Sequence, residues 1–265
     1  MSADTLLALF AHPDDESLLA GGILAAAAAA GMEVVIVSVT RGELGGAASR
    51  SGIVRARELE QAGAILGARA AFCLDFPDGD VDGDPGRLAG AVADLCERWR
   101  PRALLTFALD GWYWHRDHMA IHFAVMSTVP RVSATTSTYV TTWPRHRMTR
   151  LARAARQHGT PDGLWGLNPA AFGSSTHTFH FVVDVTPFLP AKVAAIAAHA
   201  SEATRGSLLT SLAQTVAQRY LGYEFLSLAH PGNFDLPGRL RHAGVRTRDR
   251  RRPGVAGPVP SGITP

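Results

Sequence analysis

Short apolar runs alternate with longer helix-forming runs over the first 130 residues, and this alternation restricts the fold more than any other feature of the chain. Each apolar run is short enough for a buried strand, and each helix-forming run ends near a glycine or a proline. Strands are expected at residues 6–10, 33–39, 71–74 and 103–107, and helices at residues 18–30, 52–66, 87–100 and 117–128. Because strand–helix–strand connections are right-handed, this order predicts an α/β fold, a Rossmann-like three-layer sandwich with a mostly parallel sheet.

The chain has 265 residues, 46% of them hydrophobic, which is enough for one complete core. We therefore expect a single domain over residues 1–236. Within it, residues 131–180 lose the regular period and are interpreted as an excursion over the mouth of the site, with an added strand at 138–142. A further strand is expected at 178–185, and further helices at 187–203 and 208–221.

The basic charge of the chain is concentrated at its end. The net charge is +3, yet residues 238–265 contain seven arginines and only one acidic residue. The rest of the chain is therefore mildly acidic, and no nucleic-acid partner is expected. We interpret residues 237–265 as a basic Pro/Gly-rich disordered tail, and a contact between this tail and an anionic partner is the alternative.

The sequence contains no pattern typical of secretion or membrane insertion. The first apolar run has no basic segment before it and stops at His12, and no apolar run approaches the roughly 20 residues of a membrane span. The two cysteines, Cys73 and Cys96, lie in apolar segments and do not form a disulfide framework. A cytoplasmic location without a membrane partner is the expectation, and the oligomeric state is open.

A histidine and three acidic residues follow the first expected strand directly. Pro13 suits a turn or the first position of a helix, so His12, Asp14 and Asp15 are expected to project from a strand-to-helix turn. In α/β proteins, ligands bind at this carboxyl edge of the sheet. An imidazole and a carboxylate three positions apart can bind the same divalent metal ion.

A second cluster of polar residues follows the strand expected at 103–107. His115 and His118 are three residues apart, which by itself is weak evidence for a metal site. Because both clusters follow parallel strands, they emerge at the same edge of the sheet. His12, Asp15 and His118 together would provide two imidazoles and a carboxylate and leave a position open for water, as catalytic zinc sites do.

These residues resemble the motifs of the PIG-L/LmbE-like deacetylases, zinc enzymes that remove acetyl groups from substrates of the N-acetylglucosamine type. The resemblance covers residues 5–130 and, more weakly, residues 192–202. Its motifs are residues 11–16 (AHPDDE), 40–43 (TRGE), 55–58 (RARE), 77–79 (PDG) and 115–118 (HRDH). The first and the last of these in combination are highly specific.

The resemblance implies a role for each residue of the two clusters. The zinc ligands are His12, Asp15 and His118, for one ion per chain, and another divalent metal is possible. Asp14 is the general base. His115 is the general acid, with Asp117 behind it.

The resemblance also implies supporting residues around the reacting groups. Tyr113 corresponds to a tyrosine that assists the oxyanion in a member of this family. Arg55 and Asp78 correspond to contacts with substrate hydroxyls, although a surface arginine and a turn former are the alternatives. Glu16 is expected to support the ligands from behind.

The chain departs from the family pattern beside the catalytic residues. Arg116 stands where the family usually has proline, and Trp112 and Trp114 replace a glycine-rich approach. Both departures reshape the mouth, near which Trp143 and Trp165 are also expected, and flat aromatic faces suit sugar rings or bulky apolar groups.

The function expected from the residues and the resemblance together is a zinc-dependent hydrolase. It would remove an acetyl or other acyl group from the amide nitrogen of a small-molecule N-acyl amino sugar or a glucosamine-containing conjugate. The alternative is an amidase of a glycosylated or acylated natural product with the same site. A dinucleotide-binding protein is disfavoured, because three acidic residues stand where its first turn needs glycines. A non-catalytic sugar-binding module is a further alternative.

Overall fold

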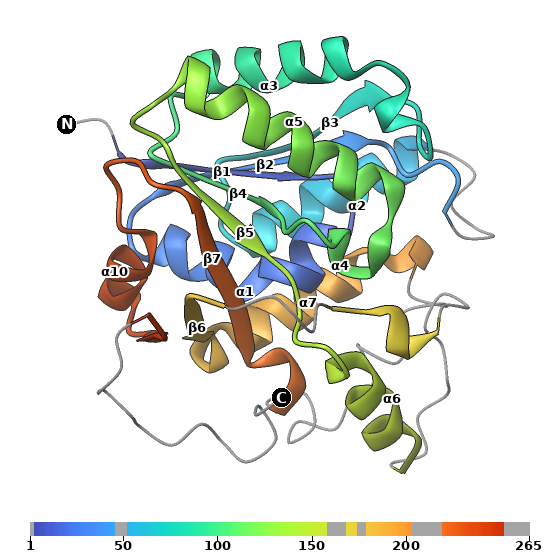
Figure 1. Cartoon of the computed structure of the whole chain (residues 1–265). Coiled ribbons are helices and arrows are strands. Elements are labelled where there is room, and N and C mark those ends of the chain that lie inside the picture. Colours follow the sequence, from blue (N-terminus) through green and yellow to red (C-terminus); the bar gives the residue numbers. More distant parts are fainter. Residues whose placement is uncertain (1–2, 46–51, 158–167, 174–178, 203–218, 252–265) are drawn as a thin grey trace.

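An eight-stranded sheet forms the centre of the computed structural model, which describes residues 3–45, 52–157, 168–173, 179–202 and 219–251 (Figure 1). The strand order is β3-β2-β1-β4-β5-β7-β6-β8. The first five strands pair in parallel, and β7, β6 and β8 continue the sheet with antiparallel pairings. The strands are β1 (Thr5–Phe10), β2 (Glu33–Thr40), β3 (Ala70–Phe76), β4 (Ala103–Phe107), β5 (Ser137–Thr141), β6 (Phe181–Asp184), β7 (Tyr223–His230) and β8 (Arg246–Asp249).

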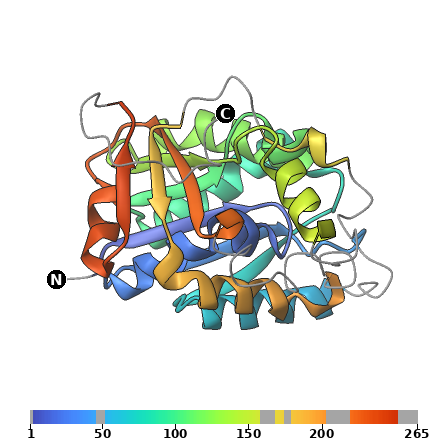
Figure 2. The same cartoon turned by 90° about the horizontal axis from the view of Figure 1, so that it is seen from below.

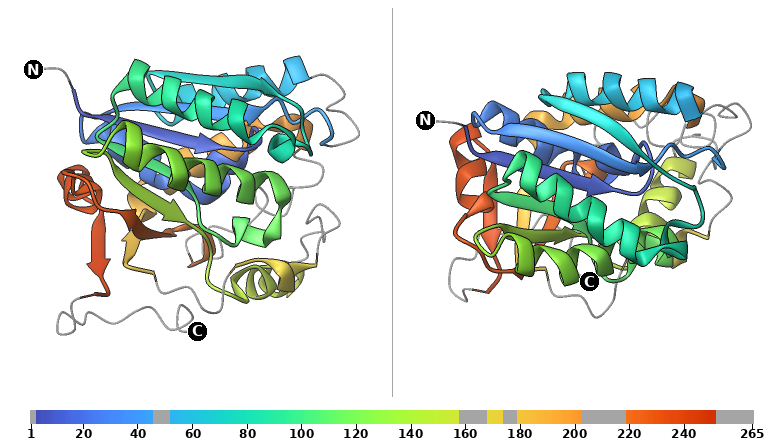
Figure 3. Two further views of the ribbon diagram at one scale, coloured as in Figure 1. Left: turned by 45° about the horizontal axis from the view of Figure 1, so that its top comes forward. Right: turned by 90° about the horizontal axis from the view of Figure 1, so that it is seen from above.

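Helices cover both faces of this sheet. On one face α3 packs beside α5, as the view from above in Figure 3 shows. On the other face α7 contacts both α1 and α2, and the view from below in Figure 2 shows α7 in orange beside α2. The helices are α1 (Asp15–Ala29), α2 (Gly52–Ile65), α3 (Pro85–Trp99), α4 (Gly111–Trp114), α5 (Arg116–Val132), α6 (Arg147–Gln157), α7 (Leu189–Ala198) and α10 (Leu236–Leu240). Among the residues that the structure describes, no helix has the length and apolarity needed to cross a membrane.

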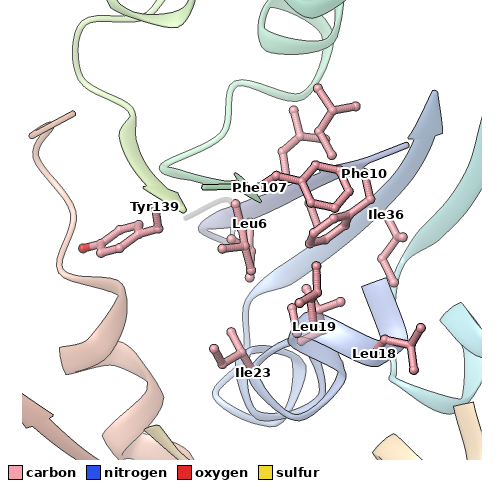
Figure 4. Packing of buried hydrophobic residues seen from close by; sticks show 14 of the residues in the cluster. Leu6, Phe10, Leu18, Leu19, Ile23, Ile36, Phe107 and Tyr139 are labelled. Carbon is pink, nitrogen blue, oxygen red and sulfur yellow. The ribbon is translucent and has the colours of Figure 1, made fainter. Parts of the chain in front are cut away.

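Strand β1 lies at the centre of the parallel part of the sheet, where β2 and β4 flank it. All six of its residues are buried, which explains why its sequence is continuously apolar rather than alternating. The rings of Phe10 and Phe107 meet edge to face at 5.1 Å, and Figure 4 shows Leu19 of α1 beside them. This packing holds the ends of β1 and β4 together at the carboxyl edge of the sheet.

The mixed α/β fold with a mostly parallel sheet agrees with the sequence expectation, and most element boundaries shift by only a few residues. One difference concerns the start of α5. Its N-cap is His115, whose Nδ1 atom accepts the Asp117 N–H at 3.3 Å, whereas the helix was expected to begin at residue 117. The helix also continues through Pro130 to Val132.

The region interpreted as an excursion over the mouth contains a strand of the central sheet. β5 is fully buried between β4 and the antiparallel strand β7. Its sequence, STYVT, is polar for such a position. Ladders on both sides satisfy its backbone, and Thr142, directly after it, donates to the Asp110 carboxylate. β7 was not expected from the sequence, and the helix expected at 208–221 lies outside the described residues up to 218.

The segment expected to be a disordered tail begins with ordered structure. Leu236, Leu240 and Val245 are buried, and they anchor α10 and the turn that leads into β8. β8 pairs antiparallel with β6 at the edge of the sheet, where Figure 2 shows it in red. Arginines suit this position because an edge strand faces solvent on one side. The domain therefore extends beyond residue 236, and residues 252–265 lie outside the described part.

Candidate metal centre and active site

Three strand ends bring the candidate site residues together. β1 leads into residues 11–15, β4 leads into α4 and the start of α5, and β3 leads into residues 77–81. Because β1, β3 and β4 belong to the parallel part of the sheet, all three connections leave from its carboxyl edge. Segments that are distant in the sequence therefore meet in one place.

Three potential metal donors form a compact triangle at this edge. The Nδ1 atom of His12 lies 3.2 Å from Nε2 of His118 and 3.5 Å from Oδ2 of Asp15. The third side, between His118 Nε2 and Asp15 Oδ2, measures 3.4 Å. All three residues are buried.

The outer nitrogens of both imidazoles have acceptors of their own. Nδ1 of His118 lies 3.0 Å from the Gly111 carbonyl oxygen, and its ring stacks on Phe107 at 4.0 Å. Nε2 of His12 lies 3.0 Å from Asp78 and 3.1 Å from Asp117. If each outer nitrogen donates its N–H to these oxygens, the inner nitrogens of His12 and His118 both present lone pairs to the triangle.

The donor triangle fits a divalent metal ion. Ligands at about 2.0–2.1 Å in tetrahedral geometry are separated by about 3.4 Å, which matches the three sides. The charges agree as well: burial opposes protonation of His12, but the carboxylates of Asp117, Asp15 and Asp78 raise its pKa well above the ordinary value. This pocket therefore attracts a positive charge. Burial lowers the pKa of His118 to about 3, so its imidazole is neutral and able to act as a ligand.

Asp14 lies beside the triangle but faces a different partner. Its φ of 127° lies in the region that favours glycine, and its backbone N–H donates to Glu16 at 3.0 Å. This turn directs its carboxylate to Arg55, whose guanidinium lies 3.3 Å away. Burial and the nearby carboxylates of Asp15 and Glu16 raise the pKa of Asp14 to about 7, and Arg55 opposes that rise. Such a carboxylate can exchange a proton near neutral pH.

His115 and Tyr113 lie beside the two histidines of the donor triangle. The His115 ring is 4.6 Å from the ring of His118 and 4.9 Å from that of His12. Burial and the charge of His12 lower the pKa of His115. Tyr113 contacts the His118 ring at 5.3 Å, and burial together with the nearby Asp15 raises the pKa of its hydroxyl, which therefore stays protonated as a donor.

The carboxylate of Asp117 contacts His12, whereas the resemblance implied a place behind His115. It is fully buried and accepts the backbone N–H groups of Gly79 at 2.8 Å and Val81 at 3.2 Å. Its contact with His115 involves the Asp117 backbone N–H instead. The two carboxylates on His12 Nε2 thus come from different segments, Asp117 from α5 and Asp78 from the β3 connection.

Arg55 and Asp78 make internal contacts in this structure. The Arg55 guanidinium is 3% exposed and donates to the carbonyl oxygens of Gly42 at 2.8 Å and Pro13 at 2.5 Å. Asp78 divides its carboxylate between His12 and the Leu44 N–H, which donates at 2.8 Å. Both residues therefore hold the loops of the site together, and the contact with substrate hydroxyls stays a prediction.

Glu16 connects the site to a histidine from the far end of the domain. Its carboxylate accepts Ser17 Oγ at 2.6 Å and the Asp14 N–H, and it lies 2.8 Å from His199 Nε2. Burial opposes ionisation of Glu16, but His199 keeps its pKa low, and the same pair raises the pKa of His199. The sequence offered only a weak signal for His199, since it lies in the less specific stretch 192–202.

A comparison with protein-family models matches residues 7–129 to the family described as PIG-L: GlcNAc-PI de-N-acetylase. A curated relative from Nakamurella multipartita, named 1D-myo-inositol 2-acetamido-2-deoxy-alpha-D-glucopyranoside deacetylase, is 33% identical over 240 residues, which cover 74% of this chain and 79% of the relative. The chain belongs to the PIG-L family. The matched part of this PIG-L chain runs from β1 into α5 and carries all three residues of the donor triangle. As a member of this family of deacetylases, it is a hydrolase of amide C–N bonds.

Solved structures show how widely this PIG-L fold is shared. The N,N'-diacetylchitobiose deacetylase from Pyrococcus horikoshii is 23% identical, with a TM-score of 0.57 over 86% of this chain and 85% of that chain. A deacetylase of the teicoplanin biosynthesis pathway is 19% identical, with a TM-score of 0.56 over 84% of this chain and 96% of that chain. At these identities the likeness is one of fold, so the substrate has to be argued from the site itself.

Proposed function

We propose that this protein is a zinc-dependent N-deacetylase that removes an acetyl or other acyl group from the amide nitrogen of an N-acyl amino sugar or a glucosamine-containing conjugate. The observation that carries the proposal is the donor triangle of His12, Asp15 and His118. Asp14 precedes Asp15 in the chain, and the His115 ring lies 4.9 Å from that of His12. An amide hydrolase needs a positive centre, a base for water and an acid for the leaving nitrogen. The three kinds of group meet here.

His12, Asp15 and His118 would hold the zinc ion. When bound, zinc lowers the pKa of a water molecule to about 7 and polarises the carbonyl of the amide. Two neutral imidazoles and one carboxylate from the protein are the donor set of catalytic zinc sites, which keep one position open. Asp117 and Asp78 orient the His12 ring, since both accept from its Nε2.

Asp14 acts as the general base for water. Its carboxylate is not one of the three donors, and its pKa of about 7 suits proton uptake at neutral pH. Arg55 holds the carboxylate in place from the side of α2. As the oxygen of water bonds to the carbonyl carbon, Asp14 takes the proton that water loses.

His115 supplies the proton for the leaving nitrogen. Its ring lies within 5 Å of both His12 and His118, so a substrate carbonyl at the metal centre places the amide nitrogen near this imidazole. The C–N bond then breaks with its electron pair on the nitrogen, which receives the proton of His115 and leaves as an amine. Tyr113 donates a hydrogen bond to the carbonyl oxygen as negative charge develops there.

The amino-sugar substrate follows from the relatives, among which the Nakamurella enzyme is named for an N-acetylglucosaminyl inositol. One observation favours the alternative, a deacylase of a natural product with the same site. Leu44 and Trp114, which adjoin the site residues Asp78 and His115, are 74% and 59% exposed. A bulky apolar group beside the amino sugar would cover them.

Acetate release tests the proposal directly. The metal-free protein is reloaded with zinc and incubated with N-acetylglucosamine, its inositol conjugate and an acylated glycopeptide, and products are detected by mass spectrometry. We expect a free amine and acetate from at least one amino sugar, and none from the metal-free protein. Stoichiometric zinc binding with no deacylation of any amino sugar would contradict the proposal and favour a binding module.

A further inference from the structure

The short helix α4, between β4 and His115, has a backbone that suits glycine but carries two tryptophans. Trp112 and Trp114 both have a φ of 66°, in the region that residues with a Cβ atom rarely adopt. Neither tryptophan suits this position by its backbone preference. We therefore expect the side chain of each tryptophan to make an interaction that compensates the strain.

The use of Trp112 is packing inside the domain. Its ring is 2% exposed and meets Trp143, Phe172 and Tyr113 at centroid distances of 5.5, 5.1 and 5.6 Å. Its backbone is fixed as well, because the Asp110 carboxylate accepts the Trp112 N–H at 3.1 Å. This cluster anchors α4 and fixes the position of the residues that follow.

Trp114 has no such place in the core. Its side chain is 59% exposed, while its backbone N–H donates to the Asp110 carbonyl oxygen at 2.8 Å. An exposed indole thus sits on an anchored backbone instead of a mobile one. A single exposed apolar residue is ordinary on a protein surface, but one held in a strained conformation directly before the general acid is not.

The position of Trp114 relative to His115 indicates which part of a substrate would meet it. In the proposed mechanism His115 protonates the leaving nitrogen, so a group bound beside His115 belongs to the amine product rather than to the acetyl group. On the loop after β2, Leu44 is 74% exposed, and its N–H donates to Asp78, which itself contacts His12. The backbone at both exposed apolar residues is therefore held by hydrogen bonds, and each residue is one neighbour away from a group that contacts His12.

We propose that Trp114 forms a subsite for a flat apolar group, such as an aromatic ring, attached to the amino sugar as its aglycone. The inference rests on the proposed function, because it assigns the leaving-group side from the role of His115. The indole face would stack on the aglycone ring. The substrate is then an N-acyl amino sugar with an apolar aglycone rather than the free sugar.

Kinetics with two glycosides of N-acetylglucosamine test this subsite. The zinc-loaded full-length protein is assayed for acetate release from the benzyl and the methyl glycoside, and KM and kcat are measured for each. We expect the wild type to show a KM about tenfold lower for the benzyl glycoside, since one stacked ring contributes about 1.4 kcal/mol. Trp114→Ala should reduce this ratio to near one, and Trp114→Phe should retain most of it.

Phe123→Ala is the matched control. Phe123 is also an exposed aromatic residue, at 57%, but it lies on the regular helix α5 and not beside His115. Its removal should leave the ratio at the wild-type value. Equal KM values for the two glycosides in the wild type, or a Trp114→Ala protein that still prefers the benzyl glycoside, would contradict the subsite but not the proposed function. A wild type that releases acetate from another amino sugar but from neither glycoside would also overturn the subsite alone, whereas release from no amino sugar would overturn it together with the proposed function.

Discussion

The carboxylate of Asp117 lies 3.1 Å from Nε2 of His12, on the side of the imidazole that faces away from the donor triangle. It is fully buried and also accepts two backbone N–H groups from the loop after β3. Asp117 therefore connects that loop to a metal ligand. The arrangement makes the Asp117 carboxylate a group that orients His12, and only the Asp117 backbone N–H contacts the His115 ring.

Asp117→Asn should weaken zinc binding by about 10- to 100-fold, because an amide is a poorer acceptor for the His12 N–H. Zinc affinity is measured by competition with a chelator. Asp80→Asn is the control, since Asp80 lies on the same loop, is 60% exposed and faces Arg116. Unchanged zinc affinity in Asp117→Asn would mean that the contact with His12 does not support the metal.

Asp14→Asn should separate catalysis from metal binding. The Asp14 carboxylate lies outside the donor triangle, so zinc content should stay at the wild-type level while kcat falls by about 10²–10⁴-fold. His118→Ala, in contrast, should lose its zinc, because it removes one of the three donors. Metal content by mass spectrometry and acetate release are measured on the same samples. Near-normal turnover in Asp14→Asn would remove it from the role of general base.

The strand ends explain how much of this site the sequence could predict. His12 and Asp15 follow an apolar run, and His118 follows another, so the carboxyl edge of a parallel sheet was the natural meeting place. The contact of Asp117 with His12 could not be predicted. It depends on how the loop that contains Gly79 and Val81 folds across the start of α5, and no local pattern encodes that path.

The same limit applies to two strands of the antiparallel part of the sheet. The strand expected at 138–142 is present as β5, although its sequence is polar. β7 was not expected, and β8 is rich in arginine and was interpreted as part of a disordered tail. β8 exists because it pairs with β6, which lies far away in the chain. The same holds for Trp112. The sequence shows an aromatic residue at this position, but its burial against Trp143 depends on tertiary packing.

Arg55→Met should move the acidic limb of the pH–activity profile to higher pH. In the proposed mechanism Asp14 acts as a base when it is deprotonated, so we expect activity to be lost as the pH falls through its pKa of about 7. The Arg55 charge lowers that pKa, and its removal therefore raises it. The profile of kcat/KM is compared with that of Arg55→Lys, which keeps a positive charge. An acidic limb that stays in place in Arg55→Met would show that Arg55 does not act on Asp14.

Lys192→Met should cost about 3–5 kcal/mol of unfolding free energy, because it leaves the buried carboxylate of Glu224 without its cation. Lys192 Nζ donates to Glu224 at 2.6 Å, and the same carboxylate accepts the N–H groups of Gly22 at 2.9 Å and Ile23 at 2.7 Å in the middle of α1. Burial lowers the pKa of Lys192, and the carboxylate of Glu224 opposes that effect. The pair therefore stabilises the fold only when both charges are present.

The double variant Lys192→Met/Glu224→Gln tests that interpretation, since a neutral amide removes the unpaired charge and still offers an oxygen to α1. In urea unfolding, the double variant should lose clearly less unfolding free energy than Lys192→Met alone. Arg69→Ala is the control for an exposed ion pair, with Glu33, and should cost about 0–1 kcal/mol. Because α1 begins with the metal ligand Asp15, a single variant that loses stability but keeps its zinc affinity would show that this pair acts on the fold and not on the site. Equal losses in the single and the double variant would contradict the unpaired charge as the cause.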